Sequence, residues 1–311
     1  MTRREFGIVT AGALAISAAP ARTEEKRIKP VIKKLGTIDL DLVETCPIVF
    51  KNRVYRFEYV RTGYWNNKTG DSYFRFIDHA SGAASPPFAQ GFHLGSAMAD
   101  DDMLIATGTN IWDGERVDIF VSRDMEHWET WNALNLPGYG IFNTSLCKAD
   151  DRYVLMFEIG KPEEFAGAAF TARFATSKDL HSWELTPPEC NYAKDRYTAP
   201  HCLRSLDGYF YDFYLESIDG GYDQRVVRSK DLIQWEPSPL NPVLKASDED
   251  KQIANPSLTP DQIEKIKGAK NINNSDIDFC EFEGRLIINY SWGNQQGVEF
   301  LAEAVYHGTM K

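Results

Sequence analysis

The stretch SRDMEHWE, residues 122–129, recurs twice along the chain, as SKDLHSWE at 177–184 and as SKDLIQWE at 229–236. The copies start 55 and 52 residues apart, a period typical of propellers and solenoids. Each copy follows an alternating, strand-like run. Its Asp can bind nearby backbone amides in a tight turn, and its Trp can anchor the strand that follows. The motif is therefore predicted to be structural rather than catalytic.

Upstream of each copy lies a hairpin of two alternating strands, and the same pattern occurs at two further places. The five hairpins begin near Cys46, His93, Asn143, Pro200 and Asp276. The first and the last lack the Ser-x-Asp turn but keep a third strand. Five β-units of similar size predict an all-β fold, a five-bladed β-propeller. A β-sandwich is the alternative, but it would not repeat its turn at this period.

Few segments favour a helix, and the clearest is residues 260–269. Thr259 can cap it, Pro260 stands first inside it, and Gln262 completes a capping box. This short helix falls in an insertion, residues 241–270, between the fourth and fifth blades. The sequence leaves open whether the insertion covers a pocket or contacts another subunit, and it leaves the oligomeric state open.

The N-terminus has the three regions of an export signal. Arg3 and Arg4 precede an apolar run at residues 8–19, which is too short to span a bilayer, and small residues at 19–21 suit cleavage. The run resembles a twin-arginine signal, which a receptor reads. We therefore expect a signal peptide at 1–21, a linker segment at 22–40 and the propeller domain at 41–311. The mature protein is expected in the periplasm or secreted, without membrane insertion.

Composition excludes several partners and cofactors. The formal net charge of −11 argues against binding nucleic acid, which needs clustered Lys and Arg. None of the five cysteines forms a CxxC pair, and no glycine-rich phosphate loop joins a strand to a helix. We therefore expect no metal and no cofactor.

A propeller concentrates side chains at one end of its central channel. The first strand of each blade starts at this face and the second strand ends there, so polar residues at both places should line one pocket. Those at strand starts are Glu44, His93, Asn143, Asp195, Arg196, His201, Asp276 and Asp278. Those at or near the ends of second strands are Glu58, Glu158, Glu216 and Trp292.

Crowded carboxylates raise one another's pKa, so a protonated acid and an ionised base can coexist at neutral pH. Glycoside cleavage needs such a pair. The predicted catalytic candidates are Glu44, Glu158, Asp195, Asp276 and Asp278. The predicted substrate-binding residues are Glu58, His93, Asn143, Arg196, His201, Glu216 and Trp292. For the two histidines, a purely structural hydrogen bond is the alternative.

The Ser-x-Asp turns, the five-unit layout and the hairpin PHCLRSLDGYFYDFYL at 200–215 resemble the five-bladed propeller glycoside hydrolases of family 43 and relatives such as family 117. The resemblance covers essentially the mature chain. It implies a propeller that acts on an oligosaccharide or polysaccharide.

That resemblance also implies three catalytic carboxylates, which this chain replaces. The base entering the first blade falls on Cys46, the modulator entering the third blade falls near Asn143, and the acid entering the fourth blade falls on Thr198. Two hypotheses follow. The chain is an exported, exo-acting glycoside hydrolase whose carboxylates have moved, or it is a noncatalytic carbohydrate-binding propeller that has lost the acid.

Overall fold

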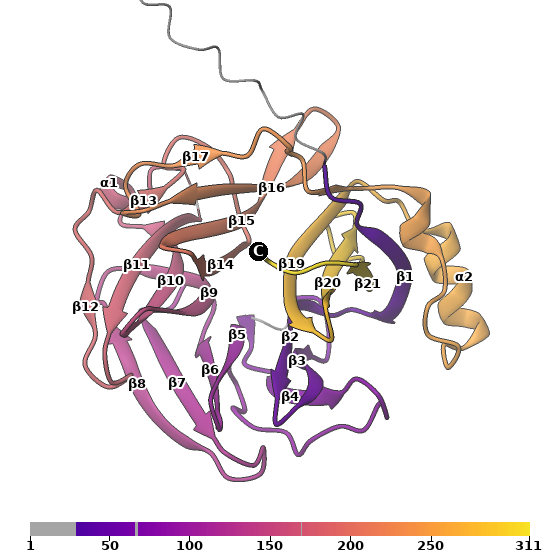
Figure 1. Ribbon diagram of the computed structural model, residues 1–311, viewed down its shortest axis with the longest axis horizontal. Coiled ribbons are helices and arrows are strands. Elements are labelled where there is room, and N and C mark those ends of the chain that lie inside the picture. The colour runs from indigo at the N-terminus through magenta and orange to yellow at the C-terminus, as the bar shows by residue number, and fades with distance from the viewer. Residues whose placement is uncertain (1–28, 66–67, 169) are drawn as a thin grey trace, which may run out of the picture. The chain divides into compact units, whose positions relative to one another are not determined.

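The computed structural model describes residues 29–65, 68–168 and 170–311, so the predicted signal peptide lies outside the described residues. Residues Val31–Lys311 form one compact unit of five antiparallel sheets around a central axis (Figure 1). Each sheet is a blade whose innermost strand lies nearest the axis. The five-bladed β-propeller predicted from the repeat is confirmed.

The blades follow one another along the chain. Blade one contains β2 (Val43–Phe50), β3 (Arg53–Arg61) and β4 (Ser72–Asp78). Blade two contains β5 (His93–Asp100), β6 (Met103–Thr109), β7 (Arg116–Ser122) and β8 (Glu129–Asn135). Blade three contains β9 (Gly140–Ala149), β10 (Arg152–Lys161), β11 (Thr171–Ser177), β12 (Glu184–Leu185) and β13 (Asn191–Tyr192).

Blade four contains β14 (His201–Leu206), β15 (Tyr209–Ile218), β16 (Gly221–Ser229), β17 (Glu236–Pro237) and β18 (Leu244–Lys245). Blade five contains β19 (Asn273–Phe282), β20 (Arg285–Gly293), β21 (Glu299–Tyr306) and β1 (Lys33–Leu40). The helical segments of the described residues are α1 (Glu163–Ala166), η2 (Asp248–Lys251) and α2 (Pro260–Gly268). None of these helices is long and apolar enough to cross a membrane.

The repeated motif forms the turn between the third and fourth strands of blades two, three and four. In the first copy, the Asp124 carboxylate accepts hydrogen bonds from the backbone N–H groups of Glu126 and His127, at 2.9 and 2.8 Å. The other two copies repeat this pattern. The motif Trp128 stacks on Phe88 of the preceding blade, with ring centroids 3.7 Å apart. The motif therefore closes a turn and packs one blade against the next.

The propeller is closed by its N-terminal strand. β1 pairs antiparallel with β21, so blade five combines both ends of the described chain. Residues 33–40 thus form a strand within the segment for which the sequence predicts a linker. The Lys34 ammonium forms a buried ion pair with Asp250 at 2.7 Å, and the Thr37 hydroxyl accepts a hydrogen bond from the Trp292 indole at 2.9 Å.

Candidate functional site

The candidate site lies where the innermost strands of the five blades begin. Counting back six residues from the last residue of each of these strands gives five equivalent positions, and all five line one cavity. They are Glu44, Leu94, Asn143, Pro200 and Asp276. The fold therefore brings carboxylates from blades one and five together with an amide from blade three.

Three of these positions share a backbone conformation that is uncommon outside glycine. The φ angles of Glu44, Leu94 and Asp276 are 48°, 53° and 52°. At each of them the pairing with the second strand shifts register, as in a β-bulge. Such conformations cost energy and are often found at functional sites. In β2 and β19 the shift occurs where the strand contributes a carboxylate to the cavity.

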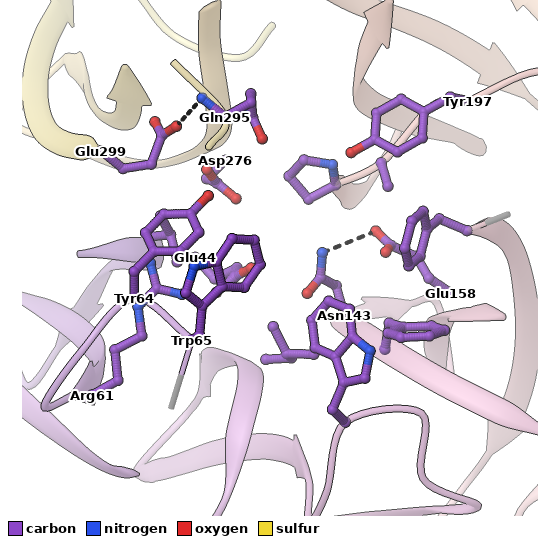
Figure 2. A pocket seen from close by; sticks show the side chains of 17 residues that line it. Glu44, Arg61, Tyr64, Trp65, Asn143, Glu158, Tyr197, Asp276, Gln295 and Glu299 are labelled. Carbon is purple, nitrogen blue, oxygen red and sulfur yellow. Dashed lines mark hydrogen bonds between the residues drawn. The ribbon is translucent and has the colours of Figure 1, made fainter. Parts of the chain in front are cut away.

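The cavity has a volume of about 130 Å³, and four carboxylates line it: Glu44, Glu158, Asp276 and Glu299. Figure 2 shows Glu158 and Asn143 on one wall, Arg61, Tyr64 and Trp65 on the other, and Asp276 near Gln295 and Glu299 at the top of the view. Glu158 lies in the second half of β10, and Glu299 is the first residue of β21.

Glu158 is fully buried and has one oxygen available for a ligand. Its Oε1 atom accepts hydrogen bonds from the backbone N–H of His201 at 3.1 Å and from the Asn143 amide at 3.4 Å. Its Oε2 atom has no hydrogen-bond partner within the described residues. Burial raises the pKa of Glu158 to about 7, although the His201 charge and the two hydrogen bonds oppose the shift. A carboxyl group with this pKa can donate a proton at neutral pH.

Asp276 is the carboxylate best supplied with stabilising groups. The Ser275 hydroxyl donates to its Oδ2 atom at 2.7 Å. Burial raises its pKa, while the hydroxyls of Ser275 and Ser291, the Arg61 charge and the backbone N–H of Glu44 act in the opposite direction. Groups that stabilise the charged form favour an ionised carboxylate.

Glu44 and Glu299 are the other two carboxyl groups of the pocket, and both interact electrostatically with Asp276. Burial and the nearby Asp276 charge raise the pKa of Glu44 well above its usual value and that of Glu299 to about 8. Glu299 accepts hydrogen bonds from the Gln295 backbone at 2.7 Å and the Asn273 amide at 3.4 Å, whereas Glu44 Oε2 has no partner within the described residues. The four carboxyl groups of the pocket therefore have raised pKa values, and the shifts differ from one group to the next.

No protein-family model matches the sequence, and no curated protein sequence matches it. Solved structures do. A GH43 protein from Bacillus licheniformis has a TM-score of 0.57 and 13% identity, over 88% of this chain and 54% of that one. A putative glycoside hydrolase from Parabacteroides distasonis has a TM-score of 0.57 and 13% identity, over 92% and 95% of the two chains. An α-L-arabinofuranosidase from Podospora anserina, solved with cellotriose, has a TM-score of 0.54 and 9% identity, over 91% and 93%.

The chain has the fold of propeller glycoside hydrolases. It spans about half the length of the B. licheniformis protein and of a xylan β-1,4-xylosidase from Bacillus halodurans. At these identities the likeness describes the fold alone, so the roles of individual residues rest on the pocket itself.

Within this glycoside-hydrolase fold, four of the residues predicted from the sequence line the cavity: Glu44, Asn143, Glu158 and Asp276. Glu58 does not, because it is the sixth residue of β3, whereas Glu158 is the seventh residue of β10. Successive side chains of a strand point to opposite faces. Glu58 instead binds Arg56 and Arg75 at 2.8 and 2.7 Å.

Two further predicted residues, Asp278 and His201, line an adjoining cavity of about 30 Å³. This cavity shares Glu44, Asn143, Pro200 and Asp276 with the main pocket. Asp278 forms an ion pair there with Arg204. His201 is buried and binds Asp212 at 2.9 Å through Nδ1, and this neighbouring charge keeps its pKa raised despite burial. The main chain of His201 also contacts Glu158, since its backbone N–H donates to Glu158 Oε1 at 3.1 Å.

The remaining predicted residues lie outside both cavities. Asp195 has a side chain that is 77% exposed and pairs with Arg196, which also binds Glu216 at 3.0 Å. His93 is buried, and burial lowers its pKa to about 4. Trp292 is fully buried against Phe300, so no ring face is open to a sugar.

Sequence reasoning missed Arg61, Gln295 and Glu299, all of which line the pocket. Glu299 begins a third strand, and third strands start at the same face at which second strands end. The starts of third strands thus contribute to the pocket as the starts of first strands do, and this topological rule predicts Glu299.

The described residues contain no group of three or more His, Cys, Asp or Glu side chains placed to hold a metal ion. All five cysteines are free, and Cys46 and Cys202 line the smaller cavity beside Asp278. Burial, together with the Asp278 charge, raises the pKa of Cys46 well above its usual value, so its thiol stays protonated and is a poor nucleophile.

Proposed function

We propose that the protein is an exported glycoside hydrolase that removes a terminal sugar from an oligosaccharide of plant or algal origin. The observation that carries this proposal is the set of four buried carboxyl groups with unequal pKa shifts around one small cavity. Unequal shifts within one site are the hallmark of acid–base pairs. The twin-arginine-type N-terminus supports export.

In this proposal Glu158 is the general acid and Asp276 is the general base. The Oε2 atom of Glu158 donates its proton to the glycosidic oxygen as the bond from that oxygen to the anomeric carbon breaks. Asp276 takes a proton from water, whose oxygen forms the new bond to the anomeric carbon. The products are a free sugar and the shortened oligosaccharide, and the two carboxyl groups exchange their protons with solvent before the next turnover.

Exo-action is supported by the size of the cavity. A volume of about 130 Å³ lies below the roughly 300–1,000 Å³ typical of pockets for larger ligands. A single sugar unit suits such a cavity, and the rest of the chain would leave past Trp65, whose side chain is 57% exposed.

The experiment combines the full chain with 4-nitrophenyl glycosides and with oligosaccharides from plant and algal cell walls, and it measures monosaccharide release. Glu158→Gln and Asp276→Asn should each lower kcat by about 10² to 10⁴ while leaving the melting temperature within a few degrees. Asp195→Asn is the matched control, because its carboxylate is exposed. Full activity in both pocket variants would exclude this mechanism.

A noncatalytic carbohydrate-binding propeller is the second candidate, and the replaced family carboxylates favour it. Cys46 and Thr198 are both buried, and the Thr198 hydroxyl lies 3.3 Å from His201 Nε2 rather than in the main pocket. Calorimetric binding of a sugar by the wild-type protein, without release from any glycan of the panel, would favour this function over hydrolysis.

A further inference from the structure

Among the described residues that line the pocket, Arg61 is the one cationic residue. Its guanidinium lies against the Tyr64 ring, 4.6 Å from the ring centroid, and Figure 2 shows the two side chains on the same wall. The Nε and Nη2 atoms are buried, and neither has a hydrogen-bond partner within the described residues. Buried polar groups are rarely left without partners, so these two donors indicate a ligand.

The pocket also holds buried oxygen atoms without partners. Within the described residues these are Asn143 Oδ1, which can only accept a hydrogen bond, and Glu44 Oε2 and Glu158 Oε2, which donate when protonated and accept when ionised. A ligand that satisfies the site must therefore accept hydrogen bonds from Arg61 and donate a hydrogen bond to Asn143. A sugar hydroxyl does both, whereas an ionised carboxylate or sulfate only accepts.

The charge of the site leads to the same class of ligand. The Arg61 charge acts on three carboxyl groups of the pocket and opposes the rise in the pKa of Glu44, Asp276 and Glu299. A uronate would add a further anion beside them and would compete with Asp276 for the guanidinium. A neutral sugar adds no charge to the pocket, so the attraction between Arg61 and these carboxyl groups stays as it is.

We propose that Arg61 binds two neighbouring hydroxyl oxygens of a neutral sugar through Nε and Nη2, and so selects neutral sugars over uronic acids. This inference rests on the proposed carbohydrate-processing function and names the class of sugar in the pocket. The planar guanidinium holds its donors in a rigid fork, so two parallel hydrogen bonds also fix the orientation of the ring.

The test is a calorimetric titration of the full chain with sugars that differ only at one carbon. The probes are glucose against glucuronic acid and galactose against galacturonic acid, with xylose and arabinose as further neutral sugars. We expect the wild type to bind a neutral sugar more tightly than its uronic acid. Arg61→Lys keeps the charge but loses the fork, so the affinity should fall roughly tenfold or more.

Arg61→Met removes both the fork and the charge. It should weaken binding as Arg61→Lys does, and it should also move the acidic limb of the pH–activity profile to higher pH, because the pKa of Asp276 rises. Arg61→Lys should leave that limb in place, a difference that a merely structural role would not produce. Arg53→Met is the matched control, since Arg53 begins the same strand and its side chain is 58% exposed.

Tighter binding of a uronic acid than of its neutral partner would overturn the inference. Wild-type affinity in both Arg61 variants would overturn it as well, while leaving the hydrolase intact if sugar release continues. If the wild type neither binds nor releases any sugar, the proposed function itself fails. The melting temperatures of all variants show whether a loss of binding reflects unfolding.

Discussion

Glu158 and Asn143 show how a hydrogen bond moderates the pKa of a buried carboxyl group. Asn143 lies where the family resemblance places a carboxylate that modulates the acid, and its amide donates to Glu158 Oε1 at 3.4 Å. A donor stabilises the ionised form of Glu158, whereas a carboxylate at that position would stabilise the protonated form. The pKa of Glu158 is thus set at about 7 mainly by burial.

The activity should therefore decline as the pH rises through about 7, because the general acid loses its proton. Asn143→Ala removes a hydrogen bond from the ionised form, so the pKa of Glu158 should rise and the alkaline limb should move up by about one unit at most. The pH dependence of kcat for both proteins measures this. An alkaline limb that stays in place would show that another group titrates there.

Trp65 is the aromatic residue most open to solvent at the pocket, with 57% of its surface exposed. Its ring packs edge-on against Tyr64, with centroids 4.7 Å apart. A sugar outside the cavity can stack on the open face. Trp65→Ala should raise KM for oligosaccharides about threefold to tenfold and leave kcat and the melting temperature nearly unchanged.

The matched control for Trp65 is Leu185→Ala, which removes a similarly exposed apolar side chain from β12, outside the pocket lining. Steady-state kinetics with an oligosaccharide and with the corresponding 4-nitrophenyl glycoside separate the two sides of the scissile bond. An unchanged KM for both substrates would exclude Trp65 as a binding platform.

A pocket residue can be predicted from the sequence only as accurately as the end of its strand can be predicted. Glu44 and Asp276 could be predicted because each lies six residues before the end of an inner strand, and the hairpin turns mark those ends clearly. Glu58 and Glu158 differ by one position relative to the strand start, which reverses the face that each side chain occupies. Whether Arg61 has partners depends on distances across the channel, which no local pattern contains.

At the scale of elements, the Ser-x-Asp turns were predictable because their hydrogen bonds join residues two or three positions apart. The pairing of β1 with β21 was not, since it joins segments more than 250 residues apart and residues 33–40 have no hairpin partner nearby. A strand of this kind is recognised only by the sheet edge that it covers.

The closure by β1 depends on a buried cation. The Lys34 ammonium, only 6% exposed, binds Asp250 and the Asn274 amide oxygen, both at 2.7 Å. Lys34→Met would leave the Asp250 carboxylate buried without its counter-charge, and such losses cost about 3–5 kcal/mol. Urea denaturation should show that the free energy of unfolding falls by this amount. Lys33→Met, at the neighbouring exposed position, is the control and should change the free energy of unfolding by less than about 0.5 kcal/mol.

At the scale of the whole molecule, the closed propeller explains why carboxyl groups from distant parts of the chain meet. Equivalent positions of five blades converge on one cavity, so any residue type that recurs at these positions is concentrated there. The protein keeps these groups buried, and burial disfavours their charged form. Stability and the chemistry of the pocket therefore depend on pH through the same side chains.

Glu299 makes this coupling measurable. Its pKa is about 8 in the folded protein and 4.5 for the free group, so below pH 4.5 it is protonated in both states and costs nothing. Between these values the folded protein keeps a proton that the unfolded chain releases, and stability falls by about 1.4 kcal/mol per pH unit for this group. Above about pH 8 Glu299 is ionised in both states, so its effect on the free energy of unfolding no longer changes with pH.

Glu299→Gln replaces the titrating group with a neutral one that can still accept the hydrogen bond from the Gln295 backbone. The variant should be no more stable than the wild type at pH 5, because Glu299 is then protonated when folded. The free energy of unfolding of the variant should rise relative to that of the wild type as the pH increases to 9. At this pH the folded wild type must either bury the Glu299 charge or bind a proton. Urea denaturation of both proteins from pH 5 to pH 9 measures this difference. Parallel curves would mean that Glu299 does not change its protonation state differently in the folded and unfolded proteins over this range, which would contradict its raised pKa.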